Sequence, residues 1–345
     1  MPYFNALFYS QIMNRWLLSG FILIVLLLAA LYLFIPSEIE VSKVVPVKCN
    51  VEAAARVLAD TDRWNVWWPG GGPDRSQGVG EADRGQGGGG PERSPDGHPV
   101  WVYGQEKYAV SQRLWRSAAV EIDADGRGTP SVLALFPHAG IDSCLVQWSF
   151  TRHAGWNPIR RWKEYWAART IFTDMGSVLG GLRNYLENDR LLYGLEIRKS
   201  RVPDTLVAET ARKERAYPST AVVYSAVQQL EQFVKGYGGK VVGYPMMNVT
   251  EDSGYLLRVA LPVDREAAPR DGILFHKLPG RMALFLEADI HGGEWSVRQA
   301  VRQMDYYISD HQKTVMAIPF LSLVTDRRAE PDTSKWVTRL DVPFF

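Results

Sequence analysis

The chain has 345 residues, enough for about two soluble domains at the usual size of ~100–200 residues each. Hydrophobic residues make up 46% and charged residues 22%, a balance typical of globular rather than disordered proteins. The net charge is +1 without a long basic run, which argues against a nucleic-acid partner, because such proteins carry clustered Lys and Arg. Cys49 and Cys144 lie far apart without metal-ligand spacing, so we expect free core thiols, with a disulfide as the alternative.

The N-terminal region contains a long apolar segment. Trp16 to Ile35 is a run of 20 residues without a charge, which matches the ~20 helical residues needed to cross a hydrocarbon core. A buried core helix and a cleaved signal peptide are the alternatives, although the apolar part of a signal peptide is shorter, ~7–15 residues. We therefore predict that residues 1–37 hold a cytoplasmic tail and a single-pass transmembrane helix over 16–35, which ends before Pro36. The short tail favours placing the soluble domains on the extracytoplasmic side.

The next segment begins with a clear strand and a short helix. Glu38–Val47 alternates and is rich in β-branched residues, which predicts a strand, and Val51–Ala59 predicts a helix with Asn50 as its N-cap. Glycine is frequent across residues 70–97, which indicates a flexible connection. This connection lacks the Gly-Lys-Ser/Thr sequence of a phosphate loop, so we expect no nucleotide cofactor there.

A series of short strands and one long helical pattern follow. We expect strands from Val100 to Phe150 and then one long helix, or a broken pair, that finishes near Asn188. The apolar residues that predict the buried face of this helix are Ile159, Trp162, Trp166, Ile171, Met175, Val178, Leu179, Leu182 and Leu186. Strands with a long closing helix predict an α+β domain in which a sheet curves around a helix.

Two parts of this region resemble START-like/polyketide-cyclase (SRPBCC) domains. The early strand and helix lead into an Asp-x-x-x-Trp-x-x-Trp turn at Asp60, Trp64 and Trp67. The residues at matching positions in the closing part are Trp148, Asn157, Pro158, Asp174 and Gly181. The resemblance implies a helix-grip fold over residues 38–190, with an apolar cavity between the sheet and the long helix.

The C-terminal half contains a sequence segment that occurs twice. Val223–Pro245 and Val297–Pro319 align without a gap over 23 residues at an offset of 74, and six positions are identical. Each copy reads as a helix that leads into a strand with one proline, followed by a strand that ends in Val/Leu-Pro. The pattern predicts two strand-helix-strand-strand repeats, at about 192–264 and 272–345, which share a sheet around a pseudo-twofold axis and leave a cleft at their seam.

This duplicated half, residues 191–345, resembles the GyrI-like effector-binding domain. The resemblance implies a small-molecule pocket at the repeat seam, and the residues expected to line it are Trp295, Trp336, Tyr255, Phe320 and Glu287. In many members of that family a pocket Glu follows the second-repeat proline by two residues. Here this position is Leu321, which argues against hydrolysis and against cation recognition of the usual kind, unless Glu287 substitutes.

Other catalytic patterns are not found in the sequence. The six histidines are scattered, no metal-ligand spacing occurs, and no Gly-x-Ser-x-Gly elbow exists, so we predict neither catalytic residues nor a metal or another cofactor. The chain is therefore interpreted as a membrane-anchored protein that binds a hydrophobic or amphipathic small molecule without a covalent step. The alternatives are a hydrolase or cyclase acting on a hydrophobic molecule, and a structural protein whose cavities are filled by side chains.

Overall fold

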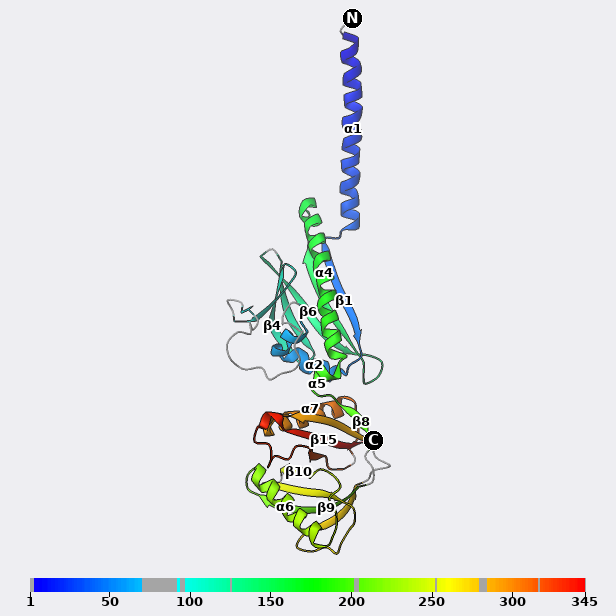
Figure 1. The fold of residues 1–345 in the computed structure, drawn as a ribbon. Helices are drawn as coiled ribbons and strands as arrows, with labels where there is room; N and C mark the ends of the chain where they lie inside the picture. Colours follow the sequence, from blue (N-terminus) through cyan, green and yellow to red (C-terminus); the bar gives the residue numbers. More distant parts are fainter. Residues whose placement is uncertain are drawn as a thin grey trace. The chain divides into compact units, whose positions relative to one another are not determined.

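The computed structural model describes most of the chain as two compact units, Met1–Glu187 and Asn188–Phe345, and each is treated by itself below. The described residues are 3–69, 92–93, 97–124, 126–201, 205–251, 253–278, 284–315 and 317–344. Most of the predicted glycine-rich connection at 70–97 lies outside these ranges. Both units combine helices with an antiparallel sheet, which confirms the α+β class (Figure 1).

The first unit begins with the apolar helix α1, Tyr3–Phe34. Within it, Trp16–Phe34 is long and apolar enough to cross a membrane, and none of this stretch is buried against the rest of the chain. The helix stops just before Pro36, whose ring would clash with the preceding helical turn. The predicted span of 16–35 therefore coincides with helix almost to its last residue.

The sheet of the first unit has seven antiparallel strands in the order β1-β7-β6-β5-β4-β3-β2 and is curled into a half-barrel. Its strands are β1 (Glu38–Val47), β2 (Glu92–Arg93), β3 (Pro99–Tyr103), β4 (Glu106–Leu114), β5 (Ser117–Ala124), β6 (Arg127–Pro137) and β7 (Cys144–His153). Its helices are α2 (Val51–Ala59), the single turn η1 (Thr61–Arg63), α3 (Trp64–Trp67) and α4 (Pro158–Leu186). The predicted strand at 38–47 and helix at 51–59 are confirmed, and the Asn50 side chain caps α2 by accepting from the Glu52 amide at 2.8 Å.

The interior of this unit is filled by aromatic rings. Six rings are fully or almost fully buried and pack against one another: Trp64, Trp67, Trp68, Trp101, Tyr108 and Trp148. The Trp148 indole donates to the Ser131 hydroxyl at 3.0 Å. Both cysteines are buried and neither forms a disulfide, which confirms the prediction of core thiols.

Helix α4 lies across the sheet as one unbroken helix (Figure 1). It starts where the Asn157 side chain accepts from two backbone amides and Pro158 takes the first turn, a position that suits proline. The predicted buried face is confirmed from Ile171 onward.

The predicted buried face is wrong at the start of α4. Ile159, Trp162 and Trp166 are exposed, and the inward positions are taken by Arg161 and Glu164. Burial of these charged residues is possible because Glu164 accepts from Arg152 at 3.0 Å and because the Arg161 guanidinium lies over an aromatic ring.

The second unit contains a single antiparallel sheet of eight strands in the order β12-β9-β11-β10-β14-β15-β13-β8. Its strands are β8 (Arg198–Ser200), β9 (Thr205–Glu214), β10 (Met246–Glu251), β11 (Tyr255–Val263), β12 (Leu274–Leu278), β13 (Leu284–His291), β14 (Phe320–Leu323) and β15 (Val337–Phe344). Its helices are α5 (Asp189–Tyr193), α6 (Thr220–Gly236), α7 (Glu294–Asp310) and the single turn η2 (Thr333–Lys335).

The strand order is symmetric about the contact between β10 and β14. One repeat supplies β9, α6, β10 and β11, the other supplies β13, α7, β14 and β15, and both helices have 17 residues. The strand that precedes each repeat pairs with the other repeat, because β8 pairs with β13 and β12 pairs with β9. Neither repeat therefore completes its part of the sheet alone.

The two faces of this sheet have different roles. Cross-strand register aligns Val259, Met247, Leu321, Leu340 and Ala288 on one face. This face packs under α6 and α7, as the neighbouring Arg212 shows by bonding to Ser225 and Gln229 of α6. Since alternate residues of a strand point to opposite faces, the other face carries a second row of side chains, which surrounds the site described below.

Adjacent glycines in α4 provide a matched test of this packing. A Cβ at Gly181 would lie 2.4 Å from the backbone carbonyl oxygen of Trp67, whereas a Cβ at Gly180 would meet nothing within 4 Å. We expect Gly181→Ala to lower the free energy of unfolding by ~1–3 kcal/mol through overpacking. Gly180→Ala should instead raise it by ~0.5–1 kcal/mol, because alanine favours helix. Urea unfolding of the two variants in non-ionic detergent measures the difference, and equal effects would contradict this packing.

Candidate functional site

Two adjoining pockets lie on the face of the sheet opposite α6 and α7. The acidic pocket has a volume of about 240 Å³ and is lined by Arg201, Thr205, Tyr244, Met246, Pro262, Leu278, Glu287, Phe320, Ser322, Arg339 and Asp341. The apolar pocket has a volume of about 310 Å³ and is lined by Val207, Glu209, Met246, Met247, Asn248, Arg258, Ala260, Leu278, Ala317, Ile318, Pro319 and Phe320. Three residues, Met246, Leu278 and Phe320, line both pockets.

The two pockets occupy equivalent places in the two repeats. Phe320 pairs with Asp341 across β14 and β15, just as Met246 pairs with Ala260 across β10 and β11. The next strand outward places Glu287 opposite Asp341 and Glu209 opposite Ala260. Each pocket thus has a glutamate on its outer strand. Only the acidic pocket has a second carboxyl group, because the position of Asp341 is an alanine in the other repeat.

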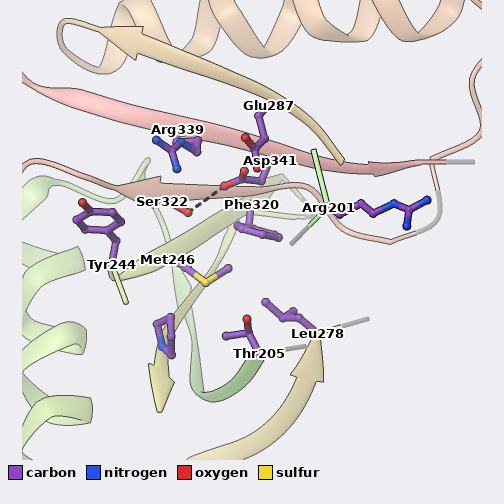
Figure 2. Close-up of a pocket in the computed structure, with 11 residues that line it drawn as sticks. Arg201, Thr205, Tyr244, Met246, Leu278, Glu287, Phe320, Ser322, Arg339 and Asp341 are labelled. Carbon is purple, nitrogen blue, oxygen red and sulfur yellow. Dashed lines mark hydrogen bonds between the residues drawn. The ribbon is translucent and has the colours of Figure 1, made fainter. Parts of the chain in front are cut away.

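Asp341 and Glu287 form a pair of neighbouring carboxyl groups on one wall of the acidic pocket. Figure 2 shows them above Phe320 and Ser322, with Met246 across the pocket. Asp341 is 3% exposed and accepts a hydrogen bond from the Ser322 hydroxyl at 2.9 Å. Glu287 accepts from the hydroxyl of Ser200 on β8. The strand β8, which precedes the first repeat, therefore orients the glutamate of the second repeat.

Two arginines, Arg201 and Arg339, line this pocket, and Arg339 is bonded to a carboxylate outside the pair. Arg339 donates from Nε to Asp289 at 2.9 Å, and Arg198 donates to the other oxygen of the same carboxylate at 2.6 Å. Burial opposes ionisation of Asp289, but these two bonds hold the pKa of its carboxyl group below the usual value. The charge of Arg339 is therefore shared with Asp289 rather than given wholly to the carboxyl pair.

The proton affinity of Asp341 is strongly raised. Burial is the main cause, the Ser322 hydrogen bond opposes it, and the nearby negative charge of Glu287 adds to it, so that the pKa of Asp341 is raised to about 7. At neutral pH the carboxyl pair therefore holds a proton part of the time. It can lose this proton when another positive charge enters the pocket.

These features determine which ligands the pockets suit. A buried carboxylate is stabilised by a cation, and an apolar volume of about 310 Å³ falls within the usual ~300–1,000 Å³ of small-molecule sites. No group of three or more His, Cys, Asp or Glu side chains with metal-binding geometry occurs in the described parts of the chain. The geometry suits an organic molecule with one charged end and an apolar body.

A third, smaller hollow lies on the helix side of the seam. It has a volume of about 40 Å³, and the residues that line it are Tyr217, Pro218, Thr220, Val223, Met247, Glu294, Val297, Leu321, Arg327 and Trp336. Arginines already occupy its aromatic faces: Arg327 lies 4.6 Å from the Trp336 ring centre and Arg298 lies 4.1 Å from that of Tyr217. We expect this hollow to reject a further cation because of these charges.

The five predicted ligand-binding residues do not form one site. Phe320 and Glu287 line the acidic pocket, and Phe320 also lines the apolar pocket. Trp336 lines the small hollow, and Tyr255 packs against Tyr217, one of its lining residues, with ring centres 5.7 Å apart. Trp295 is 70% exposed and lines none of the three volumes.

Asp341 is not among the predicted site residues, although the sequence carries a signal for it. The segment RLDVP at 339–343 and the segment RVALP at 258–262 are the same strand of the two repeats. Comparing them places a charged aspartate where the other repeat has a small apolar residue. A carboxyl group at a position that is apolar in the partner repeat indicates a function that belongs to one repeat only.

Among the described residues of the first unit, the buried side-chain atoms without a hydrogen-bond partner include the Tyr108 hydroxyl and the Trp67 indole nitrogen. Burial is the main cause of the raised pKa of Tyr108, and Asp174 and Glu106 contribute through their negative charges. Aromatic side chains fill the region around Tyr108 and Trp67. The apolar cavity expected in residues 38–190 stays a prediction.

Comparison with known proteins finds structural likeness at low similarity. No family model matches the chain, and no curated protein matches it. A cryo-EM structure of an EcmrR–DNA complex is 15% identical and covers 55% of this chain and 72% of its own, with a TM-score of 0.41. The EcmrR C-terminal domain is 13% identical and covers 44% of this chain and 98% of its own, with a TM-score of 0.37. SAV2435 bound to tetraphenylphosphonium is 13% identical and covers 44% of this chain and 94% of its own, with a TM-score of 0.31. Likeness at this level does not assign a function to this chain.

The predicted exclusion of nucleic acid is wrong. It rested on the net charge of +1 and on the absence of a basic run, yet a structure similar to this chain is a DNA complex. The prediction failed because the overall charge of a chain does not show how charge is distributed over its surface. Nucleic acid is therefore not excluded as a partner.

The raised pKa of Asp341 gives a prediction for stability. An unfolded Asp loses its proton near pH 3.9, whereas folded Asp341 keeps it up to about pH 7. The folded state thus binds more protons between these values, and the free energy of unfolding falls as the pH rises through this window. Asp341→Asn should remove this fall, a difference of roughly 1–3 kcal/mol, because one pKa unit is worth ~1.4 kcal/mol.

Urea unfolding from pH 5 to pH 7.5 measures this slope. The control is Asp264→Asn, an exposed carboxylate whose pKa is lowered by its bonds to the Lys240 amide and to Arg265, and which titrates below the window. We expect the control to keep the wild-type slope. An unchanged slope in Asp341→Asn would contradict the assignment.

Proposed function

We propose that the chain is a membrane-anchored receptor for a small amphipathic molecule with a cationic end, bound without a covalent step. The observation that carries this proposal is the carboxyl pair Asp341–Glu287 beside the apolar pocket. A cation placed between the two carboxyl groups would neutralise Glu287 and draw the proton from Asp341. The apolar body of the same ligand would lie against Met246, Leu278 and Phe320, which line both pockets.

The rest of the chain fits this role as follows. Residues 191–345 would be a GyrI-like effector-binding domain, in which the pockets flank the seam of the two repeats. Residues 38–190 would be a START-like domain, and α1 would span the bilayer with the soluble units on the extracytoplasmic side. The proposed ligand class is supported by the charges of the acidic pocket, whereas the membrane anchor is supported by the length and apolar composition of Trp16–Phe34.

Tetraphenylphosphonium is a suitable probe because it carries one charge on an apolar body. We expect the full chain in nanodiscs to bind it in isothermal titration, after subtraction of empty nanodiscs. Asp341→Asn and Glu287→Gln should each weaken binding at least tenfold at pH 8, because a buried charge pair loses one partner. The neutral triphenylphosphine oxide should bind both variants as it binds the wild type.

Two controls separate the site from the surface. Phe320→Ala should weaken both compounds, since Phe320 lines both pockets, and Trp295→Ala should change neither, because this indole is exposed outside them. Equal affinity of wild type, Asp341→Asn and Glu287→Gln for the cation would exclude this site. If no compound stabilises the protein, the alternative of a structural protein whose cavities are filled by side chains would be favoured.

A second candidate function is hydrolysis of a hydrophobic substrate, favoured by the same carboxyl pair. One carboxyl group that holds its proton near neutral pH and a neighbouring one in the same pocket can serve as general acid and general base. Neither Tyr255 nor Tyr306 lines this pocket, and the tyrosine among its lining residues is Tyr244. Mass spectrometry of ester and amide compounds incubated with wild type and Asp341→Asn tests it: substrate lost only with wild type would establish an enzyme.

A further inference from the structure

The start of α4 presents a group of large apolar side chains to its surroundings. Trp156 is 84% exposed, Ile159 70%, Trp162 51% and Trp166 47%. Trp162 and Trp166 are one helical turn apart and touch edge to face at 5.7 Å, so they form a continuous stripe with Ile159. These four residues are called the α4 patch below.

The α4 patch begins beside the end of the apolar helix. The hydroxyl of Tyr32 in α1 donates to the backbone oxygen of Trp156, and their rings lie 6.4 Å apart. The Arg161 guanidinium lies 4.7 Å from the centre of the Tyr32 ring and donates to the Pro36 carbonyl at 3.4 Å. These contacts tie the first turn of α4 to the point where α1 ends.

Positive charge borders the patch. Arg160, Lys163 and Arg169 are exposed on the same helix, and Arg169 lies 5.8 Å from the centre of the Trp166 ring. The acidic residue in this part of the helix, Glu164, is buried and paired with Arg152. The surface of these turns is therefore aromatic and cationic at once.

We propose that the α4 patch lies in the headgroup region of the same bilayer that α1 crosses, with its basic border on anionic phospholipid phosphates. Indole rings favour the interface between hydrocarbon and water, and Lys and Arg beside a membrane span are attracted to anionic lipid. The patch begins beside the end of the span, so a span in the bilayer would place it at the level of the headgroups. This inference rests on the proposed membrane anchor.

A second point of contact limits how the first unit can move. A single span would leave this unit free to swing about Pro36. An interfacial helix start would hold α4 at a fixed tilt to the bilayer. The contact with the bilayer is limited to the start of α4. Each residue adds about 1.5 Å along a helix, so Thr173 lies about 21 Å beyond Ile159. The bilayer contact should therefore fade along α4.

Depth-dependent quenching tests this in the full chain reconstituted into vesicles that contain phosphatidylglycerol. Single cysteines at Ile159→Cys, Thr173→Cys and Ile24→Cys carry an environment-sensitive dye, and spin-labelled lipids quench it according to depth. Cys49 and Cys144 are buried, and wild type treated with dye gives the background. Ile159 and Thr173 are both exposed positions of α4, so the pair is matched.

We expect the dye at position 24 to be quenched from the acyl chains and the dye at 159 to be quenched by headgroup-level labels at least twofold more than the dye at 173. Quenching at 24 with equal, weak quenching at 159 and 173 would overturn the α4 patch and leave the anchor intact. In that case cross-linking between cysteines at 159 would show a second copy as the occupant. No quenching at 24 would overturn both the anchor and the patch.

Discussion

The second unit depends on an exchange of strands between two repeats. Each repeat sends its leading strand to the outer edge of the other, through the pairs β8–β13 and β12–β9. The direct contact at the seam is short, since only Met246 and Met247 of β10 pair with Ser322 and Leu321 of β14. The exchanged strands therefore hold together a sheet whose centre has few hydrogen bonds. Side chains from both repeats, such as Met246 and Phe320, line the pockets beside the seam.

This frame explains where the pockets lie and why they differ. Helices from both repeats cover one face of the sheet, and the other face carries two symmetric sets of side chains. The symmetry gives each pocket a glutamate, and at one of the positions where the pockets differ, Asp341 against Ala260, the acidic pocket has a second carboxyl group. Duplication thus supplies equivalent walls, and divergence between the repeats supplies the carboxyl pair. The strand β8 adds Ser200 to Glu287, so the exchange also orients the site.

Local patterns allowed much of the fold to be predicted. The strand at Glu38–Val47, the helix capped by Asn50 and the repeated helices follow from alternation, capping and helical spacing, which depend on neighbours in sequence. The start of α4 could not be predicted in this way. Periodicity assigned Ile159 to the buried face, but a buried ion pair between Arg152 and Glu164, residues of different elements, occupies that face.

The site was harder to predict for the same reason. Trp295 and Trp336 were expected in one pocket because the family resemblance implies a pocket lined by aromatic residues. Trp336 lines the small hollow, but Trp295 lies in the first turn of α7 and is 70% exposed. Asp341 was overlooked because it lies in an apolar strand, and its role depends on the cross-strand neighbour Glu287. The pattern of one strand does not say which distant strand it pairs with, and a one-residue slip in that pairing would move every side chain to the other face.

The proposed function requires that a cation enters the acidic pocket and displaces the proton of Asp341. The most direct measurement is the number of protons released when tetraphenylphosphonium binds the full chain near pH 6, obtained from calorimetry in buffers of different ionisation enthalpy. We predict release of a substantial fraction of one proton by the wild type and none by Asp341→Asn, because the pKa of Asp341 is raised to about 7 before the cation binds. Binding without proton release, or equal release by both proteins, would contradict the assignment of this carboxyl pair as the ligand site.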